Sequence, residues 1–213
     1  TDEDAFVDTA REFAMSEGVD LVMGAKVVAE NAADDENKAI LISATGDVAE
    51  YLKNHRTPGD AHVLGDGTVQ ILQSEHGTLG AIICKDFEYP SFVRQAGLAG
   101  VDIMLIPSHD WEAIDPYHAR MAHFRAVENG FSMISARYHG TSTAVDFHGN
   151  MLAHMNDFTT DERILYADIP TRRIRTVYAM IGDAFAWVCG FGLLGLIAAG
   201  RRRAQSAEAV SKD

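Results

Sequence analysis

Cysteine and basic charge are both scarce in this sequence of 213 residues. It contains two cysteines, and 31 aspartates and glutamates outnumber 18 lysines and arginines, which gives a formal net charge of -13 at pH 7. Nucleic-acid binding needs clustered basic side chains that displace phosphate counterions, so the charge argues against DNA and RNA as partners. Cys84 ends a strand-like run, whereas Cys189 lies inside an apolar stretch. We therefore expect no disulfide between them.

A leader segment is also missing from the sequence. It begins at Thr1 without a methionine, and no charged segment followed by an apolar run opens it. We therefore expect a fragment whose true N-terminus lies upstream. The length suits one sizeable domain with a short appendage, and 47% of the residues are hydrophobic, which is enough for a packed core.

Hydrophobic periodicity predicts an α/β domain. Apolar residues at helical spacing predict helices over residues 1–17, 91–99 and 117–129, the last ending at Gly130 as a C-cap. Short apolar runs bounded by turn residues predict strands over residues 21–28, 39–44, 69–72, 79–84, 101–106 and 132–136. Strands that alternate with helices indicate a sheet that helices cover.

The C-terminal part has a different character. Residues 184–200 contain no charged side chain, and three arginines follow at 201–203. A bilayer span usually takes about 20 apolar residues, so this run is near the lower limit. The alternative is a buried core helix, but several glycines followed by arginines are more typical of a membrane helix. We predict a membrane-anchoring helix over residues 177–203, with its arginines in the cytoplasm, and a disordered tail over residues 204–213.

Cys84 has the sequence context of a nucleophile. It stands at the C-terminal end of a buried strand, and a helix is predicted to begin shortly afterwards. A strand-turn-helix arrangement exposes the sulfur and directs backbone N–H groups toward the group that it attacks. The alternative is that Cys84 is a small buried hydrophobic residue, as many free cysteines are.

Five segments, in order along the chain, resemble motifs of the nitrilase (carbon–nitrogen hydrolase) superfamily. They are the lysine segment at residues 51–60, the cysteine elbow at 83–94, the next strand at 100–108, the Arg-Ala-x-Glu-x helix at 123–130 and the Asp-x-x-Gly turn at 146–149. The resemblance implies an α-β-β-α sandwich over residues 1–176. It also implies a Glu-Lys-Cys triad in which Cys84 forms a thioester and Lys53 stabilises the thiolate and the oxyanion.

The same resemblance assigns further roles and marks departures from the family pattern. It places the base glutamate upstream of Thr1, outside this sequence. Two further family glutamates appear here as Asp60 and Asp86, which we expect to support the site. Lys85 stands where the acyltransferase members of the superfamily commonly have an aromatic residue. His109 and Trp111 follow a strand and are expected to flank the active site, where Trp111 lines an acyl pocket or fills the core.

No metal or other cofactor is expected. Several histidines cluster after the strand at residues 101–106, but His118 and His123 are five residues apart rather than the three or four that place two ligands on one helix face. The Gly65-Asp66-Gly67 turn lacks the strand-loop-helix setting of a phosphate site.

The end of the chain favours one branch of the superfamily. Residues 176–183, followed by the apolar run and the arginines, resemble the end of bacterial apolipoprotein N-acyltransferases. This resemblance implies an inner-membrane enzyme with a periplasmic catalytic domain, a phospholipid as acyl donor and a lipoprotein amine as acceptor. The first alternative is a hydrolase that uses Cys84 on small amides or nitriles. The second is a non-catalytic, membrane-tethered binding domain with the same fold.

Overall fold

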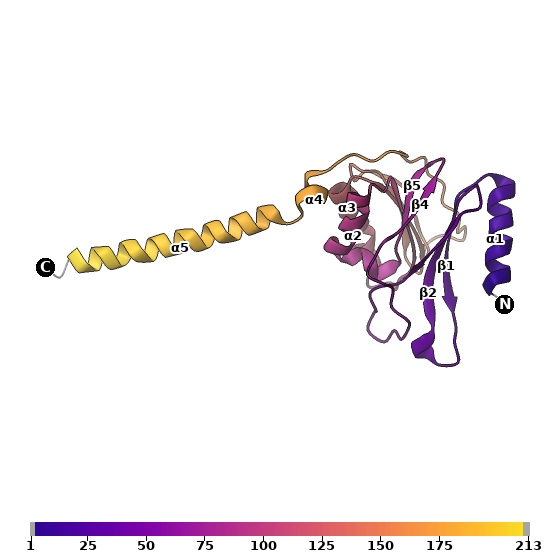
Figure 1. The fold of residues 1–213 in the computed structure, drawn as a ribbon, viewed down its shortest axis with the longest axis horizontal. Helices are drawn as coiled ribbons and strands as arrows, with labels where there is room; N and C mark the ends of the chain where they lie inside the picture. The colour runs from indigo at the N-terminus through magenta and orange to yellow at the C-terminus, as the bar shows by residue number, and fades with distance from the viewer. Residues whose placement is uncertain (1–2, 211–213) are drawn as a thin grey trace.

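Two β-sheets form the centre of the domain in the computed structural model, which describes residues 3–210 (Figure 1). The first sheet is antiparallel, with the order β1-β2-β3, and the second is mixed, with the order β4-β5-β6-β7-β8-β9. The strands of the first sheet are β1 (Leu21–Val27), β2 (Glu36–Ile42) and β3 (Val48–Leu52). Those of the second are β4 (Gln70–Ser74), β5 (Gly77–Ala81), β6 (Ile103–His109), β7 (Ser132–Tyr138), β8 (Thr141–Val145) and β9 (Met151–Asn156).

Parallel pairing is confined to the middle of the second sheet. Strands β5, β6 and β7 run parallel, with Leu79 opposite Ile103 and Ile103 opposite Ser132. The helices α2 (Pro90–Ala99) and α3 (Asp115–Asn129) make the two crossover connections. Strands that are buried on both faces tend to be apolar throughout, as the largely apolar β6 is. The segments that carry Cys84 and Asp110 follow β5 and β6 at the C-terminal ends of these strands.

The order of the layers follows from the alternation of side chains along β2. Ile40 and Ile42 face helix α1 (Glu3–Glu17), where they pack with Ala14, whereas Ala39 and Leu41 belong to the core between the sheets. Successive strand residues point to opposite faces, so one strand serves both interfaces. Helices α2 and α3 cover the outer face of the second sheet (Figure 1). The result is the α-β-β-α order that the sequence predicted.

The C-terminal helix extends away from this domain. The short helix α4 (Val177–Ile181) packs against α2 and α3, and Arg94 of α2 donates to the carbonyl oxygens of Ala179 (2.9 Å) and Met180 (2.8 Å). Helix α5 (Ala184–Val210) then projects from the domain (Figure 1). By length and composition its segment Ala184–Arg202 could cross a membrane, and none of that segment is buried within the structure.

Several predicted bounds are wrong. The strand at 79–84 ends at Ala81, and Cys84 opens the 3₁₀ helix η2 (Cys84–Glu88). The predicted tail is helical as far as Val210, and residues 211–213 lie outside the described part. The reason is composition, because the alanine, glutamine and glutamate after the arginines favour helix. The single predicted span also contains a break, since α4 ends before α5 begins.

Five elements of the described residues were not predicted: the strands β3, β8 and β9 and the 3₁₀ helices η1 (Ala32–Asp34) and η2. The three strands lack continuous apolar runs, because they carry polar residues between small or apolar ones. Their pairing with neighbouring strands supplies the stabilisation that local sequence does not.

Gly130 offers a test of how tightly the segment before α4 is held. It has φ 77°, and a Cβ atom there would clash with the carbonyl oxygen of Ile174. Gly18 has φ 64° but open space around it, so Gly18→Ala is a matched control for backbone strain alone. We expect Gly18→Ala to cost about 1 kcal/mol of unfolding free energy. Gly130→Ala should cost about 2 kcal/mol more, because the Ile174–Gly130 backbone hydrogen bond must open.

Chemical denaturation of both variants in detergent measures this difference. Equal losses for the two variants would show that the segment around Ile174 shifts freely, which contradicts tight packing against Gly130.

Candidate active site

Cys84 stands in a strained turn between β5 and α2. Its φ is 44°, in the left-handed region that residues other than glycine, asparagine and aspartate rarely adopt. The turn is held by the Asp86 amide, which donates to the carbonyl of Ile83 (3.0 Å), and it directs the Lys85 amide toward the sulfur. Strain of this kind is typical of functional turns, where surrounding contacts fix an otherwise unfavourable backbone.

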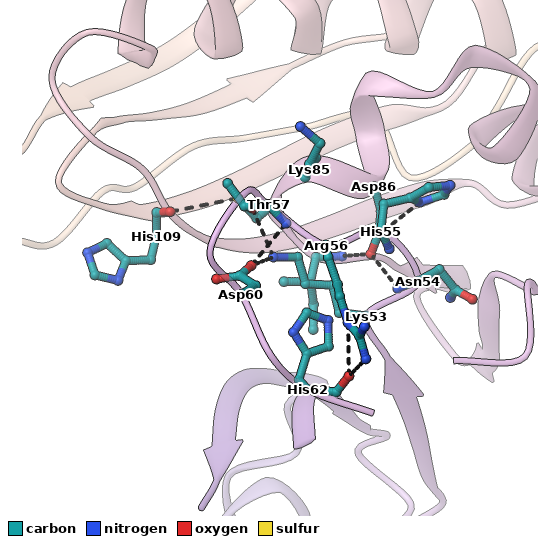
Figure 2. A network of polar contacts seen from close by, with 12 residues as sticks. Lys53, Asn54, His55, Arg56, Thr57, Asp60, His62, Lys85, Asp86 and His109 are labelled. Carbon is teal, nitrogen blue, oxygen red and sulfur yellow. Dashed lines mark hydrogen bonds and ion pairs between the residues drawn. The ribbon is translucent and has the colours of Figure 1, made fainter. Parts of the chain in front are cut away.

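Lys53 follows the last residue of β3 and is almost fully buried. Its Nζ donates to Asp60 Oδ2 at 2.9 Å and lies 3.4 Å from Thr57 Oγ1. Asp60 also accepts from the Thr57 amide at 3.1 Å. Burial raises the pKa of Asp60, but the Lys53 and Thr57 hydrogen bonds outweigh burial, so its pKa is lowered overall. The loop thus delivers a charged lysine with a paired carboxylate (Figure 2).

Asp86 joins the lysine loop to the cysteine turn. This fully buried carboxylate accepts from Tyr51 Oη (2.5 Å) and from the His55 amide (2.7 Å) and ring Nδ1 (2.8 Å). The amides of Asn54 (3.3 Å) and Ile83 (3.4 Å) complete its contacts. Figure 2 shows Asn54 and His55 converging on it. Asp86 therefore binds both loops that carry the predicted catalytic pair through their other residues.

A second buried carboxylate lies beside the sulfur. Asp110 Oδ1 is 3.8 Å from Cys84 Sγ and 3.0 Å from His118 Nδ1, and its Oδ2 accepts from Arg137 Nη1 at 2.5 Å. The other ring nitrogen of His118 lies 3.0 Å from Glu88 Oε1. Burial raises the pKa of Asp110, but His118 and Arg137 together lower it overall. The carboxylate is therefore held ionised next to the thiol.

The thiol itself is held in its neutral form. Burial raises the pKa of Cys84 most, the charge of Asp110 raises it further, and Lys53 lowers it in part, for a value of about 11. Only a small fraction is thiolate at neutral pH, so attack on a carbonyl needs a group that removes the proton.

Cys84, Lys53 and Asp110 line one cavity of about 920 Å³ between the two sheets. Its walls include Lys53, Asp60, Cys84, His109 and Trp111, so the cavity brings together five of the six predicted site residues. Trp111 is 47% exposed and therefore does not fill the core. His109 contributes its carbonyl oxygen, 3.7 Å from Sγ, while its ring contacts those of Tyr138 and His139.

Three further wall residues carry buried polar atoms with no hydrogen-bond partner in the part of the chain that the structure describes. They are His62 Nε2, Ser108 Oγ and Arg137 Nε. Burial and the charge of Lys53 lower the pKa of His62, so its ring is held neutral. Groups of this kind can hydrogen-bond a substrate that enters the cavity.

Sequence reasoning missed His62 and Arg137 as site residues, and it placed Asp110 in the loop flanking the site without giving it a role. The one available signal was Arg137, a charge directly after the predicted strand at 132–136. Asp110 lies between His109 and Trp111, which were expected to flank the site. His62 lies in a loop whose position depends on how the sheets pack, so its approach to the cavity had no local signal.

Comparison with known proteins places this geometry in a family. The model for carbon-nitrogen hydrolases, described as "Carbon-nitrogen hydrolase", matches residues 2–179, and the chain belongs to this family. The superfamily resemblance seen in the sequence is thereby confirmed, as is the nitrilase-like α/β fold.

Several bacterial relatives carry the name apolipoprotein N-acyltransferase, and two of them illustrate the similarity. Apolipoprotein N-acyltransferase 1 of Treponema denticola is 30% identical over 152 residues, covering 68% of this chain and 27% of that protein. The protein of Geobacter metallireducens is 27% identical over 191 residues, covering 78% and 36%. The chain thus spans about a quarter to a third of the length of these curated relatives.

Solved structures resemble the domain as well. An amidase from Nesterenkonia sp. AN1, in a mutant form with the acetamide moiety of fluoroacetamide added covalently at its active-site cysteine, is 25% identical with a TM-score of 0.67, covering 79% of this chain and 67% of that one. A carbon-nitrogen hydrolase from Helicobacter pylori G27, 21% identical with a TM-score of 0.69 and the same coverage, shares the fold.

Asp86→Asn tests the link between the two loops. The amide would present an NH₂ group to donors that now meet a carboxylate oxygen, so we expect a loss of about 3 kcal/mol in unfolding free energy. Asp66→Asn is the matched control, because Asp66 binds only Thr68 at the surface and should change stability by less than about 0.5 kcal/mol. Thermal unfolding in detergent measures both, and similar melting temperatures for the two variants would contradict the role of Asp86.

Proposed function

We propose that this chain carries the catalytic domain of a membrane-bound N-acyltransferase, which moves an acyl chain through a thioester on Cys84 to an amine. The observation that supports it most is the shared cavity of Cys84 and Lys53, in a domain that ends in an exposed apolar helix. The cysteine-lysine pair alone does not identify an acyltransferase, because it also suits an amidase, and the apolar helix alone does not identify one either. Their combination fits a donor or acceptor that resides in a membrane.

The first half-reaction forms the thioester. The Cys84 sulfur loses its proton to a carboxylate base, which the family resemblance assigns to a glutamate upstream of Thr1, and attacks the ester carbonyl of a phospholipid. Lys53 stabilises the oxyanion of the tetrahedral intermediate, and Asp60 keeps the ammonium group in place. The intermediate then expels the lysophospholipid alkoxide, which takes up a proton from the base.

The second half-reaction releases the acyl chain. The amine of the acceptor, a lipoprotein N-terminus in this proposal, attacks the thioester carbonyl while the base takes its proton. The C–S bond breaks, an amide forms, and Cys84 leaves as a thiol after reprotonation. His62 and Ser108 line the cavity with free polar atoms that suit contacts to the acceptor.

The proposed location follows from α5 and the arginines at its end. If α5 spans the inner membrane with Arg201 and Arg202 in the cytoplasm, the domain lies on the periplasmic side. Trp111, half-exposed at the cavity wall, would then contact the acyl chain.

A hydrolase is the second candidate. It is favoured by the Nesterenkonia amidase, to whose active-site cysteine the acetamide moiety of fluoroacetamide adds covalently in a mutant form, and by "Hydrolase C26A3.11" of Schizosaccharomyces pombe, 32% identical over 141 residues. The same thioester would form from a small amide, with ammonia leaving, and water would replace the amine in the second step.

Capture of the thioester separates the two candidates. The intact protein in detergent is incubated with phospholipid alone, and the Cys84 peptide is examined by mass spectrometry before and after neutral hydroxylamine. An acyl mass that hydroxylamine removes supports the transferase. Its absence, together with Cys84-dependent ammonia release from propionamide, would establish the hydrolase instead.

Cys84→Ala should lower amide formation on a diacylated lipopeptide by about 10³-fold or more, because no other described thiol reaches the cavity. Cys189→Ala is the matched control and should retain full activity, since Cys189 lies on the exposed helix α5. Activity that survives Cys84→Ala would refute covalent catalysis at this residue.

The anchor can be tested apart from the chemistry. Residues 183–203 fused to a soluble reporter should hold it in the membrane fraction through an alkaline carbonate wash. Leu194→Lys with Ile197→Lys should release it, because each lysine near the helix centre costs about 3 kcal/mol of insertion. Leu194→Val with Ile197→Val is the control. Release of the unsubstituted fusion would contradict the membrane assignment.

A further inference from the structure

Asp110 is an ionised carboxylate next to a nucleophile that must itself become an anion. Its Oδ1 lies 3.8 Å from Cys84 Sγ, within reach of a hydrogen bond donated by the thiol. The side chain is fully buried, as is that of Arg137, and no solvent screens their charges. A thiol can donate to this carboxylate, whereas a thiolate would be repelled by it.

We infer that Asp110 is a positioning residue of the nucleophile, which holds the free Cys84 sulfur as a thiol hydrogen-bonded to its carboxylate and so keeps it from reacting before an acyl donor arrives. This inference rests on the proposed role of Cys84 as nucleophile. It needs neither a particular donor nor a particular acceptor.

The carboxylate is held in place from three elements. Arg137 of β7 binds Oδ2, His118 of α3 binds Oδ1, and Glu88 of η2 holds the other side of the His118 ring. Phe87 packs against both partners of Asp110. The centroid of its ring lies 4.8 Å from that of the His118 ring and 5.1 Å from Arg137 Cζ. Asp110 therefore has little freedom to turn away from the sulfur.

The charges that face Cys84 have opposing effects. Lys53, from the loop after β3, and Arg137, from β7, favour the thiolate, as does the Lys85 amide in η2. Asp110, from the loop after β6, opposes them, and burial adds to its effect. Asp110 is the one charged group among the described residues that both contacts the sulfur and disfavours its ionised form.

Alkylation of Cys84 tests the inference without any acyl donor. The intact protein in detergent is treated with iodoacetamide between pH 6 and 12, a range that includes the Cys84 pKa of about 11, and modification of the Cys84 peptide is followed by mass spectrometry. In Asp110→Asn we expect the midpoint of the profile to fall by about one pH unit. The rate at pH 7.5 should rise about threefold, because a tenfold gain in thiolate is partly offset by lower nucleophilicity.

Three variants control for loosening of the structure. Asp110→Glu keeps the charge and should keep the slow reaction. Asp115→Asn removes another buried carboxylate, which binds Thr141 rather than the sulfur, and should leave the midpoint unchanged. Lys53→Met removes a charge of the opposite sign and should slow the reaction. A general loosening would accelerate all of them.

An unmoved or raised midpoint in Asp110→Asn would overturn the inference, and so would an equal shift in Asp115→Asn. If Asp110→Asn does not fold, vibrational spectroscopy of the wild-type protein at pH 7.5 tests the inference through the S–H stretching band. The Cys84→Ala spectrum is the reference that identifies the Cys84 band. A hydrogen-bonded Cys84 band that shifts in Asp110→Glu supports the inference, because the carbonyl oxygen of His109, 3.7 Å from the sulfur, is the other acceptor within reach. A missing band, a band at free-thiol frequency or a hydrogen-bonded band that does not move in Asp110→Glu refutes it. Each outcome is independent of whether phospholipid acylates the protein.

Discussion

The contacts of Asp86 are the constraint on which the site depends. The lysine loop extends from the first sheet and the cysteine turn from the second, so nothing in the connectivity alone brings them together. A single buried carboxylate accepts from backbone amides of both, at His55 (2.7 Å) and Ile83 (3.4 Å), and from Tyr51 Oη. Because a buried carboxylate without its donors is costly, the two loops are tied in one arrangement. The relative position of Lys53 and Cys84 follows from that tie.

Around the sulfur, the structure balances charges rather than simply activating the nucleophile. Lys53 and Arg137 favour a thiolate, whereas burial and Asp110 oppose it more strongly. In the proposed function a neutral resting thiol protects Cys84 until its substrate binds, since a permanent thiolate would be open to oxidation and alkylation. Burial of the site in a cavity between two sheets makes these charges effective, because little water screens them.

Helix α5 is joined to the domain through α4, which defined hydrogen bonds hold in place. Arg94 binds the last carbonyl groups of α4, and Thr176 caps the start of that helix through Ala179, so α4 is fixed to α2. The chain then turns at Gly182, which has φ 57° and lies against the Arg94 side chain. In the proposed setting, this attachment determines how the cavity is oriented relative to the membrane in which α5 lies.

Much of this protein could be predicted from its sequence. Helix and strand periodicity located α1, α2, α3 and the buried strands, because those elements carry continuous hydrophobic patterns. The apolar run before Arg201 indicated α5 for the same reason. Motif resemblance led to the family and to Cys84 and Lys53, and it indicated Asp60 and Asp86 as replacements of two family glutamates. Strands β3, β8 and β9 escaped prediction because their stability comes from neighbouring strands rather than from local pattern.

Only the tertiary structure decided what surrounds the sulfur. Asp110, His118 and Arg137 come from the loop after β6, from α3 and from β7, and no sequence spacing predicts that three such elements converge on one turn. The same holds for Asp86, which resembled a catalytic-site acid in sequence but proves to bind the backbone of the lysine loop. The physical reason is that sequence determines local conformation and residue chemistry. The burial and charge that set the state of Cys84 arise when separate sheets and helices pack against one another.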